Sequence, residues 1–494
     1  MTLIRRAFLL ASADRYFSML ANFATLAIVS RLLKPEEIGI FVLGTAVVML
    51  AQSLCAFGTP TYIVQKPQLT MDDVRGTFTI MVVIGGAIAA GLALSAPRIA
   101  AAYGEPRLVL FLWLAAICTV VDLFATLIVA LLSREMAFGK LAVMGVFNAM
   151  LHMIVVVVLA RMGFGFMCFA WAWLISAIAN GALALWMRPG LRIFLPSTTG
   201  WRDVLVFGTL NGCNVVLRQI FEQLPYLLLG RFALPTAVGN YNRALLVSRL
   251  PERIVLGGAI SVVLPAMSKR ARESQDLKGP YLRGVELISG LQWPALLVIA
   301  LLAHPVLRLL LGEQWLSAAP LLQIFTLSAL FSFVFQLNYP VLVALGAMRD
   351  LFRCSLLVLP VSTVIACGAA LLGPQELAFS MLLVVPLQAY VAFYFVRLHM
   401  RWEWHELLQA LWRSAAVAIA STLGPIMVLT LNGFDVEMSM SLAALSIGLA
   451  GGGWLAGLRL TSHPILDEAG PLMRQLRTWS SRATQIAANA SKPS

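Results

Sequence analysis

Two neighbouring apolar segments of this sequence contain arginines at a spacing suited to binding an anion. The segment at about 203–230 has Arg218 near its midpoint and Glu222 four residues later. The segment at about 238–267 holds three more arginines and one carboxylate, namely Arg243, Arg249, Glu252 and Arg253. Because a guanidinium group donates to two phosphate oxygens at once, this excess of arginine predicts a cationic, water-filled cavity that binds phosphate.

An alternative leaves these arginines without a ligand. Arg218 and Glu222 are one helical turn apart and are spaced to pair with each other. Arg243 and Arg249 have side chains long enough to extend toward the membrane surface. Ion pairing alone cannot neutralise the positive charge of this cluster, because it holds four arginines and only two carboxylates. The cationic cavity is therefore our prediction.

Both halves of the chain open with the same short motif. Arg31-x3-Pro35-x3-Gly39 recurs 200 residues later as Arg231-x3-Pro235-x3-Gly239. The same offset superposes Asp14, Ser18 and Asn22 on Asn214, Arg218 and Glu222, so each half opens with polar residues on one helical face. Thr25 extends the row in the first half, and Asn211 extends it in the second. Six predicted spans separate the copies, which is typical of transporters built from parallel repeats. Ordinary turn chemistry, with Pro starting and Gly ending a bend, is the alternative.

One carboxylate stands apart from these rows. Asp122 lies alone in the apolar segment at about 108–132, where a desolvated carboxylate suits coupling to protons. The alternative is a buried Asp122 hydrogen-bonded to Thr119 or Thr126. The six cysteines show no CxxC pair, and no metal site or cofactor is predicted.

The composition determines which elements must hold these residues. The chain has 494 residues, 60% of them hydrophobic and 12% charged, with a mean hydropathy of +0.86. A helix needs roughly 20 apolar residues to cross a bilayer. The predicted fold is all-α, because the apolar runs do not alternate as barrel strands would. Fourteen membrane helices are predicted, with twelve as the other possible count, at about 14–33, 38–59, 76–96, 108–132, 141–160, 165–187, 203–230, 238–267, 284–303, 318–345, 352–372, 377–396, 407–431 and 439–459.

These helices divide into predicted domains. Residues 1–195 and 196–400 form two pseudo-symmetric six-helix lobes, 401–460 supply two additional helices, and 461–494 form a cytoplasmic tail. The net charge of +13 does not indicate nucleic-acid binding, since the basic residues are scattered among short loops. Alternate loops hold 24 of the 36 Lys and Arg residues, so the positive-inside rule places both termini in the cytoplasm of a bacterial inner-membrane protein.

Five short segments, in this order, resemble those of Wzx-type polysaccharide flippases, which belong to the multidrug/oligosaccharidyl-lipid/polysaccharide exporter superfamily. The resemblance runs from about residue 10 to 350. The segments are Arg31-Leu-Leu-Lys-Pro-Glu-Glu-Ile-Gly39, Phe57-Gly-Thr-Pro-Thr-Tyr-Ile-Val-Gln-Lys66, Arg134-Glu-Met-Ala-Phe138, Leu264-Pro-Ala-Met-Ser268 and Leu311-Gly-Glu-Gln-Trp315.

The resemblance implies a transporter, not an enzyme, that flips undecaprenyl-pyrophosphate-linked oligosaccharide repeat units for exopolysaccharide, capsule or O-antigen assembly by alternating access. It implies membrane lipids as surroundings, and a polysaccharide polymerase and glycosyltransferases of the same pathway as candidate partners. A proton or sodium gradient is the candidate energy source. Helices one, two, seven and eight line the cavity in such proteins, so the expected pyrophosphate contacts are Asp14, Arg15, Arg218, Arg249 and Arg253.

Three rival functions remain. A multidrug antiporter of the same superfamily needs acidic residues to attract cationic drugs, and the positive excess argues against it. A peptidoglycan-precursor flippase is compatible with the same cavity charge. A membrane-embedded polysaccharide polymerase or ligase needs a long external loop, whereas no predicted external loop exceeds about 15 residues.

Overall fold

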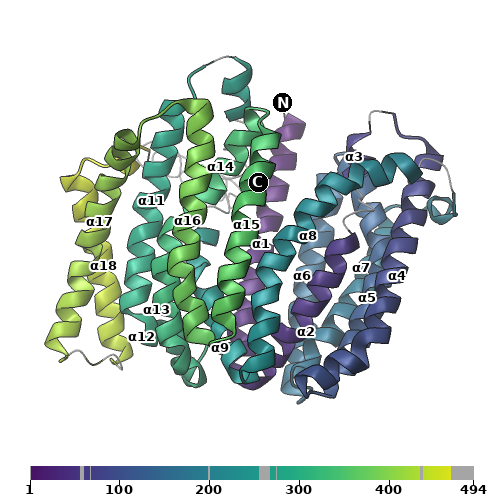
Figure 1. The fold of residues 1–494 in the computed structure, drawn as a ribbon, viewed down its shortest axis with the longest axis horizontal. Coiled ribbons are helices and arrows are strands. Elements are labelled where there is room, and N and C mark those ends of the chain that lie inside the picture. The colour runs from purple at the N-terminus through teal and green to yellow at the C-terminus, as the bar shows by residue number, and fades with distance from the viewer. Residues whose placement is uncertain are drawn as a thin grey trace, which may run out of the picture. The chain divides into compact units, whose positions relative to one another are not determined.

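All regular secondary structure in the described part of this computed structural model is helical (Figure 1). Eleven helices there are long and apolar enough to cross a membrane, so the chain is a multi-span membrane protein. Each of the fourteen predicted segments overlaps an observed helix, while fourteen as the number of crossings stays a prediction. The structure describes residues 2–55, 61–66, 68–197, 201–254, 267–273, 275–433, 435 and 438–468.

The chain divides into two compact units that are not continuous in sequence. Unit 1 comprises Met1–Val247, Leu307–Leu321 and Phe352–Gln388, and unit 2 comprises Ser248–Val306, Leu322–Leu351 and Ala389–Ser494. The six-helix lobes and their boundaries stay predictions. The helices run α1 (Thr2–Leu32), α2 (Pro35–Ser53), α3 (Thr61–Gln65), α4 (Met71–Tyr103), α5 (Arg107–Arg134), α6 (Phe138–Arg161), α7 (Met167–Met187), η2 (Leu191–Phe194), α8 (Trp201–Phe232), α9 (Pro235–Ser248), α11 (Lys278–Leu301), α12 (Ala303–Leu310), η3 (Glu313–Ala318), α13 (Ala319–Ser328), η4 (Ala329–Phe331), α14 (Phe333–Ala344), α15 (Met348–Ala370), α16 (Pro374–Met400), α17 (Trp404–Leu431) and α18 (Met440–Leu460).

Local chemistry determines where several helices of unit 1 begin and end. Pro35 begins α2, a position where its missing N–H is not needed. Thr70 and Asp73 form a reciprocal capping box at the start of α4, and Gly104 ends that helix in the left-handed region, with φ of 66°. These caps satisfy backbone groups that a membrane helix cannot leave unpaired.

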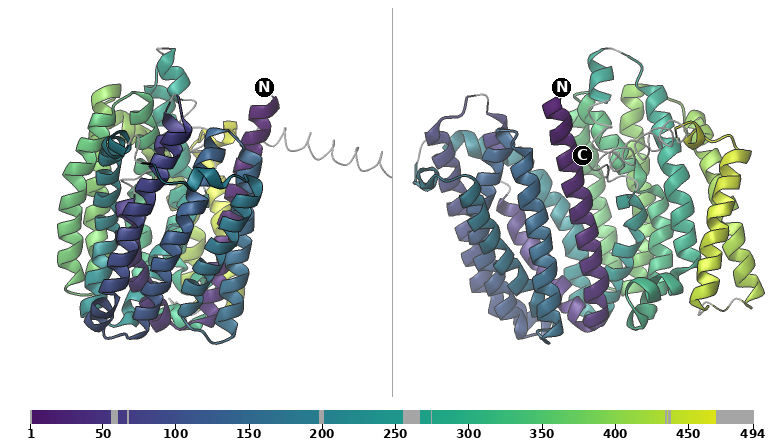
Figure 2. Two further views of the ribbon diagram at one scale, coloured as in Figure 1. Left: turned by 90° about the vertical axis from the view of Figure 1, so that its right-hand side faces the viewer. Right: turned by 180° about the vertical axis from the view of Figure 1, so that it is seen from behind.

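An aromatic core holds the first helices of unit 1 together. α4 packs along α5, α5 along α7, and α1 along α6, as the view from behind in Figure 2 shows for α1. Phe41 of α2 stacks on Phe169 of α7, with ring centroids 3.8 Å apart, and meets the fully buried Phe111 of α5 edge-on. Because α2 is held in this core, its other face is free to meet α8, which it also contacts.

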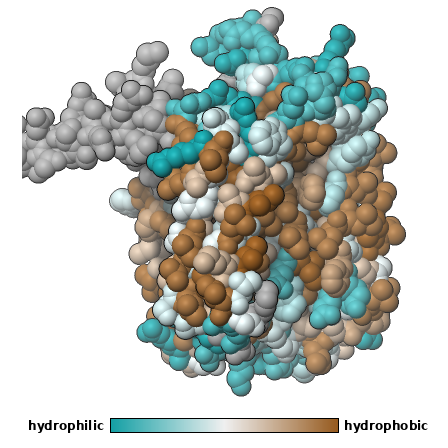
Figure 3. Space-filling model, turned by 90° about the vertical axis from the view of Figure 1, so that its left-hand side faces the viewer, coloured by the Kyte–Doolittle hydropathy of each residue, from teal (hydrophilic) through white to brown (hydrophobic). Residues whose placement is uncertain are grey.

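Unit 2 contains a second helical layer in which α11 packs along α17, and α17 along α18. A side chain at Gly453 of α18 would overlap the carbonyl oxygen of Ala420, so glycine allows the two backbones to approach closely. The opposite side of α17 exposes apolar residues, namely Leu408, Trp412, Ile419, Leu423 and Met427. Figure 3, which views the molecule from the side of α17 and α18, shows apolar side chains between two hydrophilic ends. This pattern suits contact with lipid.

Candidate functional site

The two copies of the repeated motif contact each other within unit 1. A side chain at Gly39 of α2 would overlap the carbonyl oxygen of Pro235 in α9. The reciprocal substitution at Gly239 would overlap the carbonyl oxygen of Pro35. Each motif therefore uses its glycine to admit the proline backbone of the other copy, and the residues do more than form a turn.

The segment around Trp315 makes hydrogen bonds to the end of α1, next to this contact between the motifs. The indole Nε1 of Trp315 donates to the carbonyl oxygen of Ser30 at 2.7 Å, and Trp315 is fully buried. Gln314 Nε2 donates to the carbonyl of Leu33 at 3.0 Å, and Arg31 donates to that of Leu309. Two of the segments quoted for the family resemblance thus meet in space, although about 280 residues separate them.

Arg243 is buried beside this contact, whereas its sequence had predicted a place in a water-filled cavity. Its side chain is 4% exposed, and its guanidinium carbon lies 5.7 Å from the centroid of the Trp315 ring. Stacking on an indole ring explains how a guanidinium group can be accommodated in this interior. No salt bridge to Arg243 is found among the described residues.

Arg218 and Glu222 pair along α8, as the alternative interpretation predicted. Arg218 Nε lies 3.3 Å from Glu222 Oε1, yet the Arg218 side chain remains 72% exposed. An exposed ion pair of this kind contributes little to stability. The pairing therefore leaves the guanidinium of Arg218 accessible to a ligand.

Arg249 and Arg253 belong to unit 2, whereas Arg218, Glu222 and Arg243 belong to unit 1. Both side chains are exposed, and the amide of Arg253 donates to the carbonyl of Arg249 at 3.1 Å. The two arginines thus share one helical face, as their spacing predicted.

Asn22 of α1 is exposed. The side chains of Asp14, Arg15, Asn211 and Asn214 lie outside those that the structure describes, and their roles stay predictions.

Asp122 lines a cavity of about 220 Å³ inside unit 1. Its predicted hydrogen bonds to Thr119 and Thr126 are wrong for the described residues. The hydroxyl of Thr119 donates to the carbonyl of Ala115 at 2.9 Å instead, since a threonine in a helix readily bonds the preceding turn. The Cys118 thiol, a weak donor, lies 3.5 Å from Asp122 Oδ2. The other lining residues are Gln52, Cys55, Met81, Leu123 and the two threonines.

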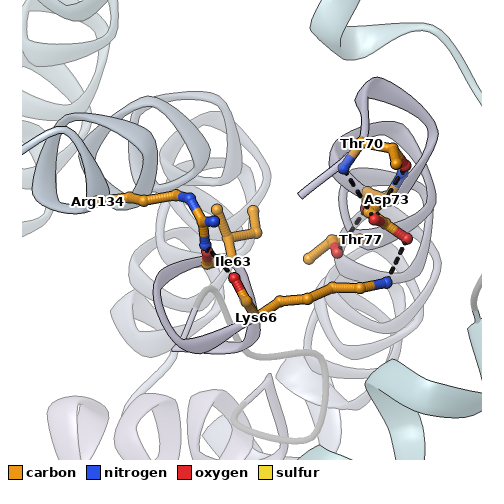
Figure 4. Close-up of polar contacts among 6 residues, drawn as sticks. All are labelled: Ile63, Lys66, Thr70, Asp73, Thr77 and Arg134. Atoms are coloured by element: carbon orange, nitrogen blue, oxygen red, sulfur yellow. Dashed lines mark hydrogen bonds and ion pairs between the residues drawn. The ribbon is translucent and has the colours of Figure 1, made fainter. Parts of the chain in front are cut away.

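A cluster of hydrogen bonds at the far end of α5 was not predicted as a site, although most of its residues lie in segments that resemble those of Wzx-type flippases. Arg134 Nη1 donates to the carbonyls of Ile63 at 2.6 Å and Lys66 at 2.5 Å, which caps the short helix α3 (Figure 4). Lys66 Nζ reaches Asp73 Oδ1 at 2.7 Å. Hydrogen bonds to Asp73 and Tyr62 raise the pKa of Lys66 to about 12. The only signal for this contact in the sequence was that Lys66 and Arg134 lie in two of the segments that resemble Wzx-type flippases.

The helical bundle shares its fold with a solved structure of a membrane flippase. The structure is similar to "Lipid II flippase MurJ, inward closed conformation", with a TM-score of 0.76, 11% sequence identity, and coverage of 93% of this chain and 100% of that one. The chain belongs to the family of polysaccharide biosynthesis proteins, whose model matches residues 28–320.

Two curated relatives illustrate the family. "Succinoglycan biosynthesis transport protein ExoT" of Rhizobium meliloti (strain 1021) is 24% identical over 309 residues, 62% of this chain and 62% of ExoT. "Lipopolysaccharide biosynthesis protein WzxC" of Escherichia coli (strain K12) is 21% identical over 308 residues, 60% of this chain and 61% of WzxC. The match thus spans less than two thirds of either relative. The resemblance to Wzx-type proteins is confirmed.

Proposed function

We propose that this protein flips undecaprenyl-pyrophosphate-linked oligosaccharide repeat units across the bacterial inner membrane, for exopolysaccharide, capsule or O-antigen assembly. It acts as a transporter, with both termini in the cytoplasm. The observation that carries the proposal is the exposed guanidinium of Arg218, near the middle of α8. An arginine at that depth of a membrane helix costs free energy unless it serves a ligand or a polar cavity.

Diphosphate is the ligand chemistry that fits these arginines. Arg249 and Arg253 offer two further exposed guanidinium groups on one helical face, and each can bind two phosphate oxygens. A multidrug antiporter that attracts cations gains nothing from three exposed arginines, so the anionic substrate is the better match. The relatives' names, which refer to succinoglycan transport and lipopolysaccharide biosynthesis, support the same substrate class.

The contact between the two motif copies supports alternating access. Gly39 and Gly239 bring two backbones into contact without side chains of their own, and such a contact can separate and reform. In this proposal the contact closes the periplasmic end while the arginines receive substrate from the cytoplasmic side. A proton or sodium gradient supplies the energy, and the pathway's polymerase and glycosyltransferases are the proposed partners.

The test is the double substitution Arg218→Ala with Arg249→Ala in a strain lacking the chromosomal gene. Surface polysaccharide should fall to the level of the gene deletion, with lipid-linked repeat units accumulating in the cytoplasmic leaflet. Arg161→Ala, an exposed arginine at the end of α6, is the matched control and should export normally. Normal export by the double variant, at normal membrane abundance, would overturn the proposal.

A further inference from the structure

A buried arginine with an unpaired N–H group lies beside the contact between the two motif copies. Arg243 comes one helical turn after Gly239 on α9, and it is 4% exposed. The Nε atom of Arg243 has no hydrogen-bond partner. No carboxylate among the described residues forms a salt bridge with it either. Because a guanidinium group loses its hydration when it is buried, this arrangement is costly in free energy.

Asn240 adds a second unpaired polar atom on the same face of α9. Asn240 and Arg243 are three residues apart and are therefore neighbours on the surface of this helix. The amide nitrogen of Asn240 donates to Ser317 Oγ at 3.0 Å, whereas its amide oxygen is buried without a donor. A buried polar group that lacks a partner raises the free energy of the state that buries it. Both side chains therefore oppose the closed contact that the adjacent Gly239 makes.

The first copy of the motif shows that the fold accepts apolar residues at both of these positions. The offset of 200 residues places Ile40 and Leu43 where the second copy has Asn240 and Arg243. Ile40 is 1% exposed and Leu43 is 2% exposed, so the positions are as deeply buried in the first copy as in the second. Aliphatic side chains fill such positions without any loss of polar hydration. Packing alone therefore does not explain why the second copy holds an amide and a guanidinium group.

The ring of Trp315 offsets only part of this unfavourable free energy. The guanidinium carbon of Arg243 lies 5.7 Å from the ring centroid, and a cation–π contact returns less free energy than the burial of an ion removes.

We propose that Arg243 and Asn240 hold the contact between the two motif copies close to the point of opening, because separation of the copies would return water to both polar groups. Two states that differ little in free energy interchange readily, which alternating access requires. The effect on the contact stands without the proposed transport function, whereas its effect on export rests on that function.

Arg243→Met in the purified full-length protein tests the proposal without any substrate. Methionine is flexible and uncharged, and it can fill the space that the arginine leaves. The Tm should rise by several degrees, because the closed state no longer buries an unpaired charge. Exchange of the backbone amide hydrogens in residues 35–44 and 235–244 should slow about tenfold, because the contact opens less often. Arg243→Leu, which copies Leu43 of the first motif, should change both quantities in the same direction. Arg243→Lys keeps the charge and should not raise the Tm.

Arg98→Met provides the matched control, because Arg98 is an exposed arginine of α4 in the same unit. This variant should leave both the Tm and the amide exchange unchanged. If neither Arg243→Met nor Arg243→Leu raised the Tm, Arg243 would merely stabilise the fold and the proposal would be overturned. Faster amide exchange at the two motif copies in these variants would overturn it as well.

Export is a separate measurement. Arg243→Met should reduce surface polysaccharide several-fold at normal membrane abundance, while Arg243→Lys should retain export. Normal export by Arg243→Met with a raised Tm would overturn the role in transport and leave the effect on the contact. Normal export by the double variant Arg218→Ala with Arg249→Ala would overturn the transport proposal alone, because the Tm and the amide exchange are measured without substrate.

Discussion

Gly39 lies directly against the carbonyl oxygen of Pro235, the proline that occupies the place of Pro35 in the second copy of the motif. Gly239 meets Pro35 in the same way. Two segments that are 200 residues apart thus form a nearly symmetric contact in which the absence of a side chain is the essential feature.

We predict that Gly39→Ala prevents this contact from closing. The added methyl group would overlap a backbone carbonyl that cannot rotate away, and overpacking of this kind costs roughly 1–3 kcal/mol. Export, measured as surface polysaccharide at normal membrane abundance of the variant, should fall sharply. Gly86→Ala is the control, because a side chain at Gly86 has no neighbour within 4 Å among the described atoms. Unchanged export by Gly39→Ala would remove the proposed role of the contact.

We predict that Trp315 stabilises the closed contact through both its N–H group and its ring. Trp315→Phe removes the hydrogen bond to Ser30 and should reduce the free energy of unfolding by roughly 0.5–1.5 kcal/mol. Trp315→Ala also removes the ring over Arg243 and should cost roughly 3–5 kcal/mol. Thermal unfolding in detergent measures both. An equal loss in the two variants would show that the ring contributes nothing.

We predict that Arg134 stabilises α3 through the position of its Nη1 atom, which donates to two carbonyls, and not through charge alone. Arg134→Lys keeps the charge, but its ammonium nitrogen ends one bond nearer to the backbone than Nη1. It should therefore lose most of the stability that Arg134→Ala loses. Each bond to a charged donor contributes roughly 1.5–3 kcal/mol. Thermal unfolding again gives the measurement, with Arg98→Ala, an exposed arginine of α4, as the control. Wild-type stability of the lysine variant would contradict the prediction.

We predict that His463 makes unit 2 sensitive to acid. His463 is 1% exposed, and its Nε2 lies 3.2 Å from Ser414 Oγ. Burial and the positive charge of Arg413 lower the pKa of His463 to about 4. Between pH 6.5 and 4 the unfolded chain therefore binds a proton that the folded chain does not, so stability falls as the pH falls. The linked loss at pH 5 is at most roughly 2 kcal/mol.

The comparison of Tm at pH 7 and pH 5 tests this titration. His463→Gln keeps a donor near Ser414 but does not titrate, so its Tm should fall less than that of wild type over this interval. His405→Gln, whose parent side chain is 62% exposed, should behave as wild type. If the Tm decreased equally in wild type and in His463→Gln, the acid sensitivity would belong to other groups.

The sequence alone was enough to predict the helices, because the membrane imposes one simple rule on it. Every apolar run long enough to cross the bilayer must satisfy its backbone internally, and all fourteen predicted segments accordingly overlap helices. The motif spacing likewise revealed the repeat, since Pro35 and Pro235 begin α2 and α9. The i, i+4 spacing of Arg218 and Glu222 also sufficed to foresee their pairing as an alternative.

Partners that are distant along the chain were decided only by the tertiary structure. Arg243 looked like its neighbour Arg249 in sequence, yet one is buried on Trp315 and the other is exposed. Asp122 appeared isolated, yet packing of α2 beside α5 brings Gln52 to its cavity. Periodicity reports which face of a helix is polar, whereas the helix that covers that face depends on how the chain folds back, and no local pattern encodes this.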